Sequence, residues 1–183
     1  MRWFGRQRQV EQLVGAYYEP LYRYAYRLSG SPQEAEDLTQ ETFCQAQNKL
    51  GQLREPDRAK AWLFSILRNG YLRRVRSSKQ EHRVPLDSVG EIPERPSEPL
   101  PEVDPAQLQA ALGELPEAFR TPIILFYFEE FSYREIADQM TVPLGTVMSR
   151  LARAKTYLRQ RLLQLAPSLA AETSQGRDRD GMS

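Results

Sequence analysis

The sequence predicts an all-α protein made of two small helical domains, a flexible acidic, proline-rich linker between them, and a helix-turn-helix in the second domain. Apolar residues recur at helical spacing along most of the chain, and no segment alternates as a β-strand does. Residues 84–105 hold six of the 13 prolines and no periodic apolar pattern. Residues 132–155 combine a short capped helix, a turn and a longer basic helix.

Charge is distributed unevenly along the 183 residues, although the net charge is only +1. Residues 54–83 carry nine Lys or Arg and three acids, and residues 84–117 carry eight acids and one Arg. Residues 140–166 carry five basic residues and no acid. This pattern predicts two cationic surfaces joined by an anionic linker.

Cysteine and histidine are too scarce for most metal or nucleophile chemistry. Cys44 is the only cysteine and His82 the only histidine, so no intrachain disulfide forms and a metal site would depend on carboxylates. A Cys44–His82 pair is disfavoured because Cys44 lies on a helix and His82 borders the flexible segment. We therefore expect that the protein is not an enzyme and that it binds no cofactor and no metal ion. No stretch approaches the ~20 apolar residues of a membrane span, so a cytoplasmic protein without membrane insertion is expected.

The first domain, residues 1–83, is expected to contain three helical segments. Pro20 interrupts the first apolar pattern, which predicts two helices or a sharp kink there. Ser31, Pro32 and Glu34 form the start of the second segment, with Ser31 and Glu34 as a capping box. No Lys or Arg occurs in residues 28–48, so the outer face of this helix is anionic. The third helix spans about residues 58–77 and is basic in its second half.

The second domain, residues 106–166, begins with apolar residues at helical spacing that Pro116 interrupts. Ser132 and Glu135 form a capping box at the start of a short helix. A last helix follows over about residues 144–165, and residues 167–183 are expected to be a disordered tail.

This last pair of helices has the order of a DNA-binding helix-turn-helix, whose second helix enters the major groove. Its apolar residues face inward, so four polar side chains face outward, namely Thr146, Ser149, Arg150 and Arg153. Arginine can bond guanine bidentately, and Lys155 is better placed for phosphates. A basic solvated helix in an ordinary bundle is the alternative interpretation.

Three motifs resemble those of the extracytoplasmic-function (ECF) family of RNA polymerase sigma factors. They follow the family's order along the chain, and the resemblance covers about residues 10–163. The sequences FSYREIA at 131–137 and PLGTVMSRL at 143–151 closely resemble the family's C-terminal helix-turn-helix. AEDLTQETF at 35–43 resembles its polymerase-binding segment, and AWLFSILRN at 61–69 its promoter-melting segment. The resemblance implies a protein that binds core RNA polymerase and promoter DNA, and it suggests control by an anti-sigma factor.

The resemblance also assigns expected roles to individual residues. Core polymerase would be bound by Glu36, Asp37, Leu38, Gln40 and Glu41, although such acidic faces are more often merely solvated. The −10 element would be bound by Trp62, Arg68, Asn69, Arg73, Arg74 and Arg76, and residues 53–58 would hold a flipped base. Trp62 is ambiguous, because a tryptophan on an apolar helix face is more often a core residue. The −35 element would be read by Thr146, Ser149, Arg150, Arg153 and Lys155.

The sequence departs from the family's pattern at four positions. Arg73 stands where Asp is frequent, Thr141 replaces a glycine of the turn, Met148 replaces a basic residue, and Pro122 lies inside a helix. A helix-turn-helix regulator that does not bind core polymerase is the alternative function. The acidic motif and the tryptophan-containing basic helix disfavour it, because such a regulator needs neither.

Overall fold

The computed structural model describes residues 2–53, 55–77 and 104–165, and all of its regular elements there are helices. The expected linker lies almost wholly outside the described residues, as does the expected tail at 167–183. The all-α prediction is confirmed. Within the described segments, no helix has the length and apolar character needed to cross a membrane.

Three long helices form the N-terminal half: α1 (Arg2–Ser29), α2 (Pro32–Lys49) and α3 (Ala59–Ser77). Two short 3-10 turns, Leu50–Gln52 and Pro56–Arg58, lie between α2 and α3. Of the two alternatives expected at Pro20, two separate helices is wrong, because α1 continues through it. A proline removes only one backbone donor, and the residues that follow it, Leu21, Tyr24 and Ala25, are fully buried. Their packing offsets the lost hydrogen bond.

The start of α2 is capped on one side only. The Ser31 hydroxyl accepts from the Glu34 amide at 3.3 Å, as expected. The Ser31 amide, however, donates to the Ser29 hydroxyl at 3.3 Å, so the predicted capping box with Glu34 is incomplete. The Ser29 hydroxyl therefore accepts from the Ser31 amide, whereas in a complete capping box the Glu34 carboxylate would accept from it.

Four helices form the C-terminal half: α4 (Pro105–Glu114), α5 (Glu117–Tyr127), α6 (Tyr133–Met140) and α7 (Leu144–Leu165). The break at Pro116 and the Ser132–Glu135 capping box are confirmed, the latter in both directions. Pro122 lies inside α5 and is buried, and α5 continues past it. Thr141 ends α6 in the left-handed conformation, with φ 54° and ψ 48°.

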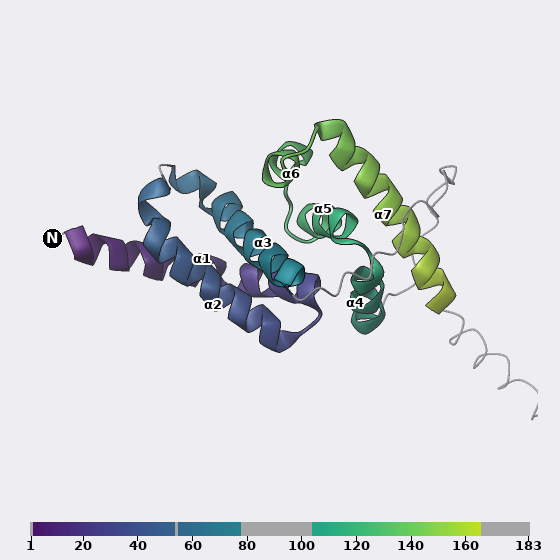
Figure 1. Ribbon diagram of the computed structural model, residues 1–183, viewed down its shortest axis with the longest axis horizontal. Coiled ribbons are helices and arrows are strands. Elements are labelled where there is room, and N and C mark those ends of the chain that lie inside the picture. Colours follow the sequence, from purple (N-terminus) through teal and green to yellow (C-terminus); the bar gives the residue numbers. More distant parts are fainter. Residues whose placement is uncertain (1, 54, 78–103, 166–183) are drawn as a thin grey trace, which may run out of the picture.

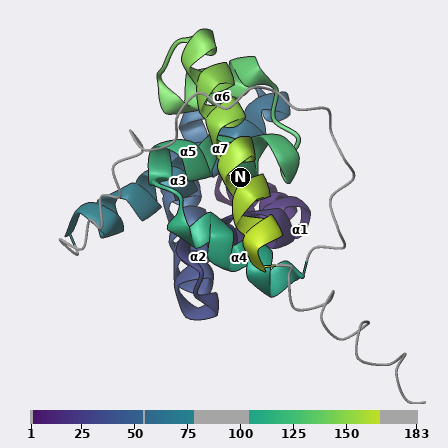
Figure 2. The same ribbon diagram turned by 90° about the vertical axis from the view of Figure 1, so that its right-hand side faces the viewer.

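The two halves pack against each other and share one apolar cluster. In Figure 1, α1 to α3 occupy one side and α4 to α7 the other, and Figure 2 shows α7 on the outer surface, away from α1 to α3. The rings of Tyr24 and Phe64 lie 5.0 Å apart, and Phe64 lies 5.2 Å from Phe131 of the other half. This row of aromatic rings links the two halves.

Polar contacts surround the shared cluster and define what we call the interdomain seam. Gln109 of α4 donates to the carbonyls of Tyr26 and Arg27, both at 3.3 Å. Arg120 of α5 donates to the Leu28 carbonyl at 2.7 Å and to the Tyr71 hydroxyl at 3.2 Å. On the α3 side, Gln139 donates to the Ala61 carbonyl at 3.1 Å, and the Lys60 ammonium donates to the Glu129 carbonyl.

Candidate polymerase and nucleic-acid interfaces

The outer face of α2 presents an acidic surface. Glu36, Asp37 and Gln40 are exposed, and Gln40 donates to the Glu36 carboxylate at 3.2 Å. Leu38 is only 1% exposed and packs in the core. It therefore supports this surface from beneath and presents no side chain to a partner.

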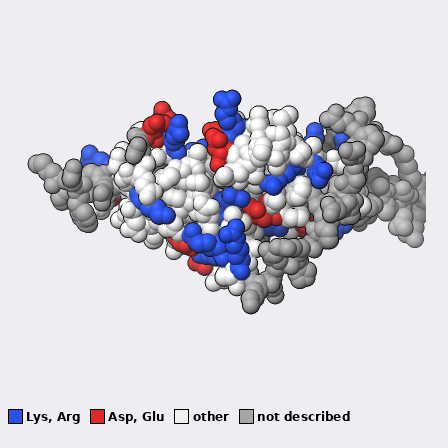
Figure 3. Space-filling model, turned by 45° about the horizontal axis from the view of Figure 1, so that its top comes forward, with Lys and Arg blue, Asp and Glu red and all other residues white. Residues whose placement is uncertain are grey.

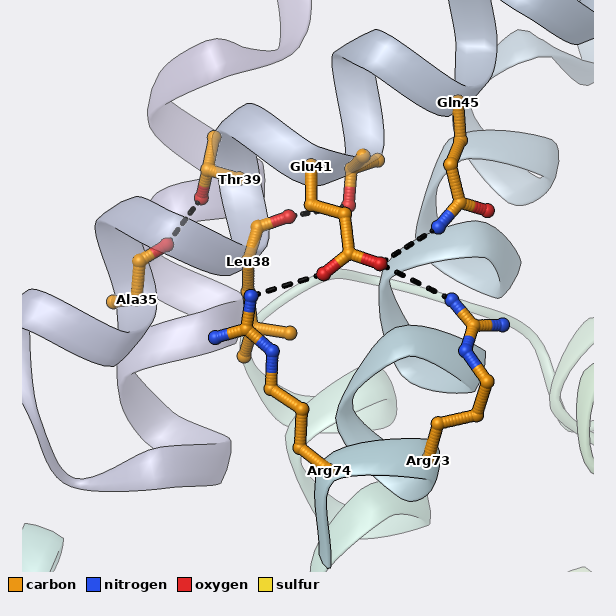
Figure 4. A network of polar contacts seen from close by, with 8 residues as sticks. Ala35, Leu38, Thr39, Glu41, Gln45, Arg73 and Arg74 are labelled. Atoms are coloured by element: carbon orange, nitrogen blue, oxygen red, sulfur yellow. Dashed lines mark hydrogen bonds and ion pairs between the residues drawn. The ribbon is translucent and has the colours of Figure 1, made fainter. Parts of the chain in front are cut away.

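Glu41, at the edge of the same surface, is tied to α3 (Figure 4). Its carboxylate accepts from Arg74 at 2.9 Å, from Arg73 at 3.3 Å and from Gln45 at 2.8 Å. Partial burial disfavours ionisation of Glu41, but the hydrogen bonds from the two arginines outweigh it and lower its pKa. Two residues expected to bind −10 DNA are thus paired with a residue expected to bind polymerase.

Arg68 of α3 is held in the interdomain seam. Its guanidinium donates to the Glu117 carboxylate at 3.0 and 3.2 Å and to the Gln139 carbonyl at 3.4 Å. Its side chain is only 12% exposed. By contrast, Asn69 and Arg76 are exposed on the same helix. The C-terminal half therefore covers Arg68.

A surface cavity of about 400 Å³ lies beside the loop that was expected to hold a flipped base. Trp62 is half-buried and lines this cavity, so it occupies neither a fully buried core position nor a fully exposed one. The remaining lining residues are Gln52, Leu53, Glu55, Arg58, Ala61, Ser65, Asp138 and Gln139. The last two belong to α6, so the helix-turn-helix forms one wall of the cavity.

On α7, the second helix of the helix-turn-helix, the apolar residues that were predicted to face inward do so. Val147, Leu151 and Ala154 are buried. Ser149, Arg153 and Lys155 are exposed, whereas Thr146 and Arg150 are half-buried, and the Ser149 hydroxyl donates to the Thr146 carbonyl at 3.1 Å. Within the described part of the chain, the side chains of Arg150, Arg153 and Lys155 have no ion-pair or hydrogen-bond partner. These cations are available to an external anion.

Basic side chains are not confined to α7. Figure 3 shows Lys and Arg in separate clusters along one face of the molecule, with acidic side chains between them.

No group of three side chains able to hold a metal ion occurs among the described residues.

Sequence reasoning missed the acids of the interdomain seam. Glu129 is 5% exposed, and burial raises its pKa to about 7 although Arg27 and Lys60 oppose the shift. The Arg27 guanidinium lies 3.8 Å from the Glu129 carboxylate and stacks on the Phe128 ring. A pair of acids in the sequence, Glu129-Glu130 after an apolar run, was the only signal, and it does not show which acid is buried.

Three buried polar atoms have no hydrogen-bond partner among the described residues: the Tyr24 hydroxyl, Glu129 Oε1 and Gln139 Oε1. Glu129 and Gln139 both belong to the seam, and Tyr24 lies beside Phe64 at its centre. Burial of an unpaired polar atom is costly, and the seam contains all three.

Comparison with known proteins agrees with this arrangement. The model of sigma-70 region 2 matches residues 13–81, and the model of sigma-70 region 4 matches residues 106–158. The ECF RNA polymerase sigma factor SigL of Mycobacterium tuberculosis is 34% identical over 150 residues, which are 79% of this chain and 84% of that protein. The chain belongs to the ECF RNA polymerase sigma factors.

Other relatives of this ECF sigma factor are similar over most of its length. SigE of Mycolicibacterium smegmatis is 39% identical over 164 residues, but the match spans only 61% of that longer protein. SigW of Bacillus subtilis is 29% identical over 175 residues, which are 88% of this chain and 92% of SigW.

Solved structures show the same fold. The sigma factor RpoE of Bartonella quintana, solved with the anti-sigma factor NepR, superposes with a TM-score of 0.67 at 31% identity, covering 85% of this chain and 97% of that chain. CnrH, solved with the cytosolic domain of CnrY, gives a TM-score of 0.63 at 24% identity, covering 87% and 90%. In this ECF sigma factor, region 2 corresponds to α1–α3 and region 4 to α4–α7.

Proposed function

We propose that this protein binds core RNA polymerase and directs it to specific promoters, acting in the cytoplasm without catalysis of its own. Residues 1–83 would bind polymerase and recognise the −10 element, and residues 106–166 would read the −35 element. Residues 84–105 would connect them, with residues 167–183 as a tail. The observation that carries this proposal is that α7 has no acidic residue and that its Arg150 and Arg153 have no ion-pair partner among the described residues, on a chain whose α2 presents an acidic surface.

The acidic surface of α2 supports polymerase binding because charge complementarity steers and orients association. The exposed residues are Glu36, Asp37 and Gln40, with Glu41 at their edge. A helix-turn-helix regulator that acts without polymerase would have no use for this surface. An anti-sigma factor is a second proposed partner, because the similar sigma factor RpoE was solved in complex with the anti-sigma factor NepR.

Transcription in vitro tests the proposal. Core polymerase plus the full chain should initiate from a subset of promoters in a library, and core polymerase alone should not. Asp37→Lys reverses one charge of the α2 surface and should reduce association with core polymerase without changing unfolding of the chain. Glu11→Lys, at another exposed acid on α1, is the matched control and should associate normally. Initiation that is unaffected by Asp37→Lys would remove Asp37 from the interface.

The only cysteine offers a second readout. Cys44 is exposed and lies one helical turn beyond Gln40 on the same face of α2. Core polymerase should therefore slow alkylation of Cys44 by a maleimide, and the Asp37→Lys variant should lose this protection.

Promoter binding in this scheme requires the interdomain seam to open. The Arg68 donors that would meet DNA phosphates already bond Glu117, and α6 forms one wall of the cavity beside the expected base-binding loop. Opening of the seam would expose both the Arg68 donors and the cavity beside that loop. In this proposal, the closed arrangement is the form of the protein before it binds polymerase or DNA.

A further inference from the structure

An apolar strip runs along the exposed side of α7 at its N-terminal end. Leu144, Met148 and Ala152 are spaced four residues apart, so they lie in one row on the helix surface. Leu144 is 46% exposed and Met148 is 52% exposed, and Ala152 is exposed as well. Exposed apolar side chains in a row are unfavourable in water unless a partner covers them.

Cationic side chains adjoin the strip. Lys155 lies seven residues after Met148 on the same side of α7, Arg153 lies across the exposed face of the helix, and α7 carries no Asp or Glu at all. An occupant must therefore bring negative charge next to an apolar group. An apolar protein surface meets only half of this requirement.

The major groove of DNA meets both halves. Phosphates border the groove, and the C5-methyl of thymine is the apolar group that base edges present within it. The first turns of the second helix are the part of a helix-turn-helix that reaches base edges. Methionine suits this contact because its unbranched thioether adapts its shape to the group it covers.

We propose that Met148 is a specificity-determining residue that contacts the methyl group of a thymine in the upstream promoter element. The inference deepens the proposed function and rests on α7 reading that element. It assigns a role to a position where the family pattern has a basic residue. A basic residue at this position would contact a phosphate whatever the DNA sequence. Met148 instead makes an apolar contact that favours one base.

Removal of single methyl groups from the DNA tests the inference. Holoenzyme assembled from core polymerase and the full chain first selects its preferred upstream sequence from a randomised library. Each selected thymine is then replaced, one at a time, by deoxyuridine, which lacks only the C5-methyl. At one thymine, binding by wild-type holoenzyme should weaken about fourfold, the effect of exposing one methyl group.

Variants show whether Met148 makes that contact. In holoenzyme carrying Met148→Ala, thymine and deoxyuridine should bind equally at that position, which is the coupling expected of two groups in contact. Leu163→Ala is the matched control, since Leu163 is 51% exposed at the other end of α7, and it should retain the fourfold difference. Met148→Lys should lose the thymine preference and steepen the salt dependence of binding by about one phosphate contact.

The outcomes separate this inference from the proposed function. If wild-type holoenzyme selects no upstream sequence, promoter recognition fails and the Met148 inference fails with it. If a sequence is selected and depends on Arg150, but no thymine responds to loss of its methyl, only the Met148 inference is overturned. A methyl effect of equal size in Met148→Ala also overturns it and leaves the strip to a protein partner.

Discussion

Arg68 of α3 and Glu117 of α5 are joined by two hydrogen bonds of 3.0 and 3.2 Å across the interdomain seam. The pair is largely shielded from solvent, with side-chain exposures of 12% and 26%. A guanidinium that donates to a carboxylate in this way cannot offer the same N–H groups to a phosphate. Closure of the two halves therefore withdraws these Arg68 N–H groups from any contact with DNA.

Weakening of this pair should favour DNA binding by the free protein. Glu117→Gln removes the charge that assists the hydrogen bonds, at about 1 kcal/mol, and should raise affinity for a single-stranded −10 oligonucleotide about fivefold. Fluorescence anisotropy of the labelled oligonucleotide measures the affinity, and small-angle scattering should show a larger radius of gyration.

Glu114→Gln is the control for this prediction. Glu114 accepts from Tyr157 at 2.6 Å and from Arg161 at 2.8 Å, both on α7 of its own half. Its replacement weakens an ion pair without touching the seam, so DNA affinity should not change. An equal gain in both variants would show that general loosening of the C-terminal half, and not release of Arg68, is responsible.

Stability should depend on pH through Glu129. The pKa of this glutamate is raised to about 7 in the fold, first by burial, against about 4.3 in an unfolded chain. Between these values the fold retains a proton that the unfolded chain has lost, so the free energy of unfolding falls as pH rises from about 4.5 to about 7. Glu129→Gln should therefore be more stable than wild type above pH 7, by on the order of 2 kcal/mol, and similar to it near pH 4.5.

Urea unfolding at several pH values measures this difference between the two proteins. The charged groups around Glu129 are Arg27 and Arg23 of α1, Lys60 of α3 and the adjacent Glu130. Glu130 is exposed, so Glu130→Gln should keep the wild-type pH dependence. A difference between wild type and Glu129→Gln that does not vary with pH would contradict the assignment.

Thr141 stores backbone strain in the turn of the helix-turn-helix. A β-branched residue at φ 54° is unfavourable, whereas glycine adopts this conformation freely. Because Thr141 is exposed, Thr141→Gly should raise the free energy of unfolding by about 0.5–1 kcal/mol without loss of packing. The reverse change, Gly30→Ala at φ 74°, should lower it by a similar amount. Thermal unfolding of both variants checks the two signs.

Arg150 and Lys155 should differ in the kind of DNA contact they make. Arg150→Ala should weaken binding to the selected upstream element by about 1–3 kcal/mol and relax the preference for one base pair. Lys155→Ala should weaken binding to all sequences alike and reduce the salt slope by about one. Competition binding by holoenzyme with selected and scrambled DNA distinguishes them. Uniform weakening by Arg150→Ala would make Arg150 a phosphate contact.

The helices and the helix-turn-helix could be predicted from sequence because their signals are local. The Ser132–Glu135 box and the 144–165 helix follow from spacing and capping, and the structure reproduces both. The helix was not expected to continue through Pro20, because the cost of a helical proline is local, whereas the buried residues that offset it contact other helices.

The interdomain seam could not be predicted for the same physical reason. Arg68 and Glu117 are 49 residues apart, and no periodicity links their positions. A basic helix predicts attraction to phosphate whether its arginines are free or paired. Arg73 and Arg74 illustrate this ambiguity, since both bond Glu41 of α2.

The Tyr24 hydroxyl, Glu129 Oε1 and Gln139 Oε1 are buried without a hydrogen-bond partner among the described residues. Separation of the halves would let water reach these oxygens, which returns part of the free energy lost when the apolar surfaces part. The free-energy difference between the closed and open forms should therefore be small. A ligand with only a modest preference for the open form would be enough to shift it.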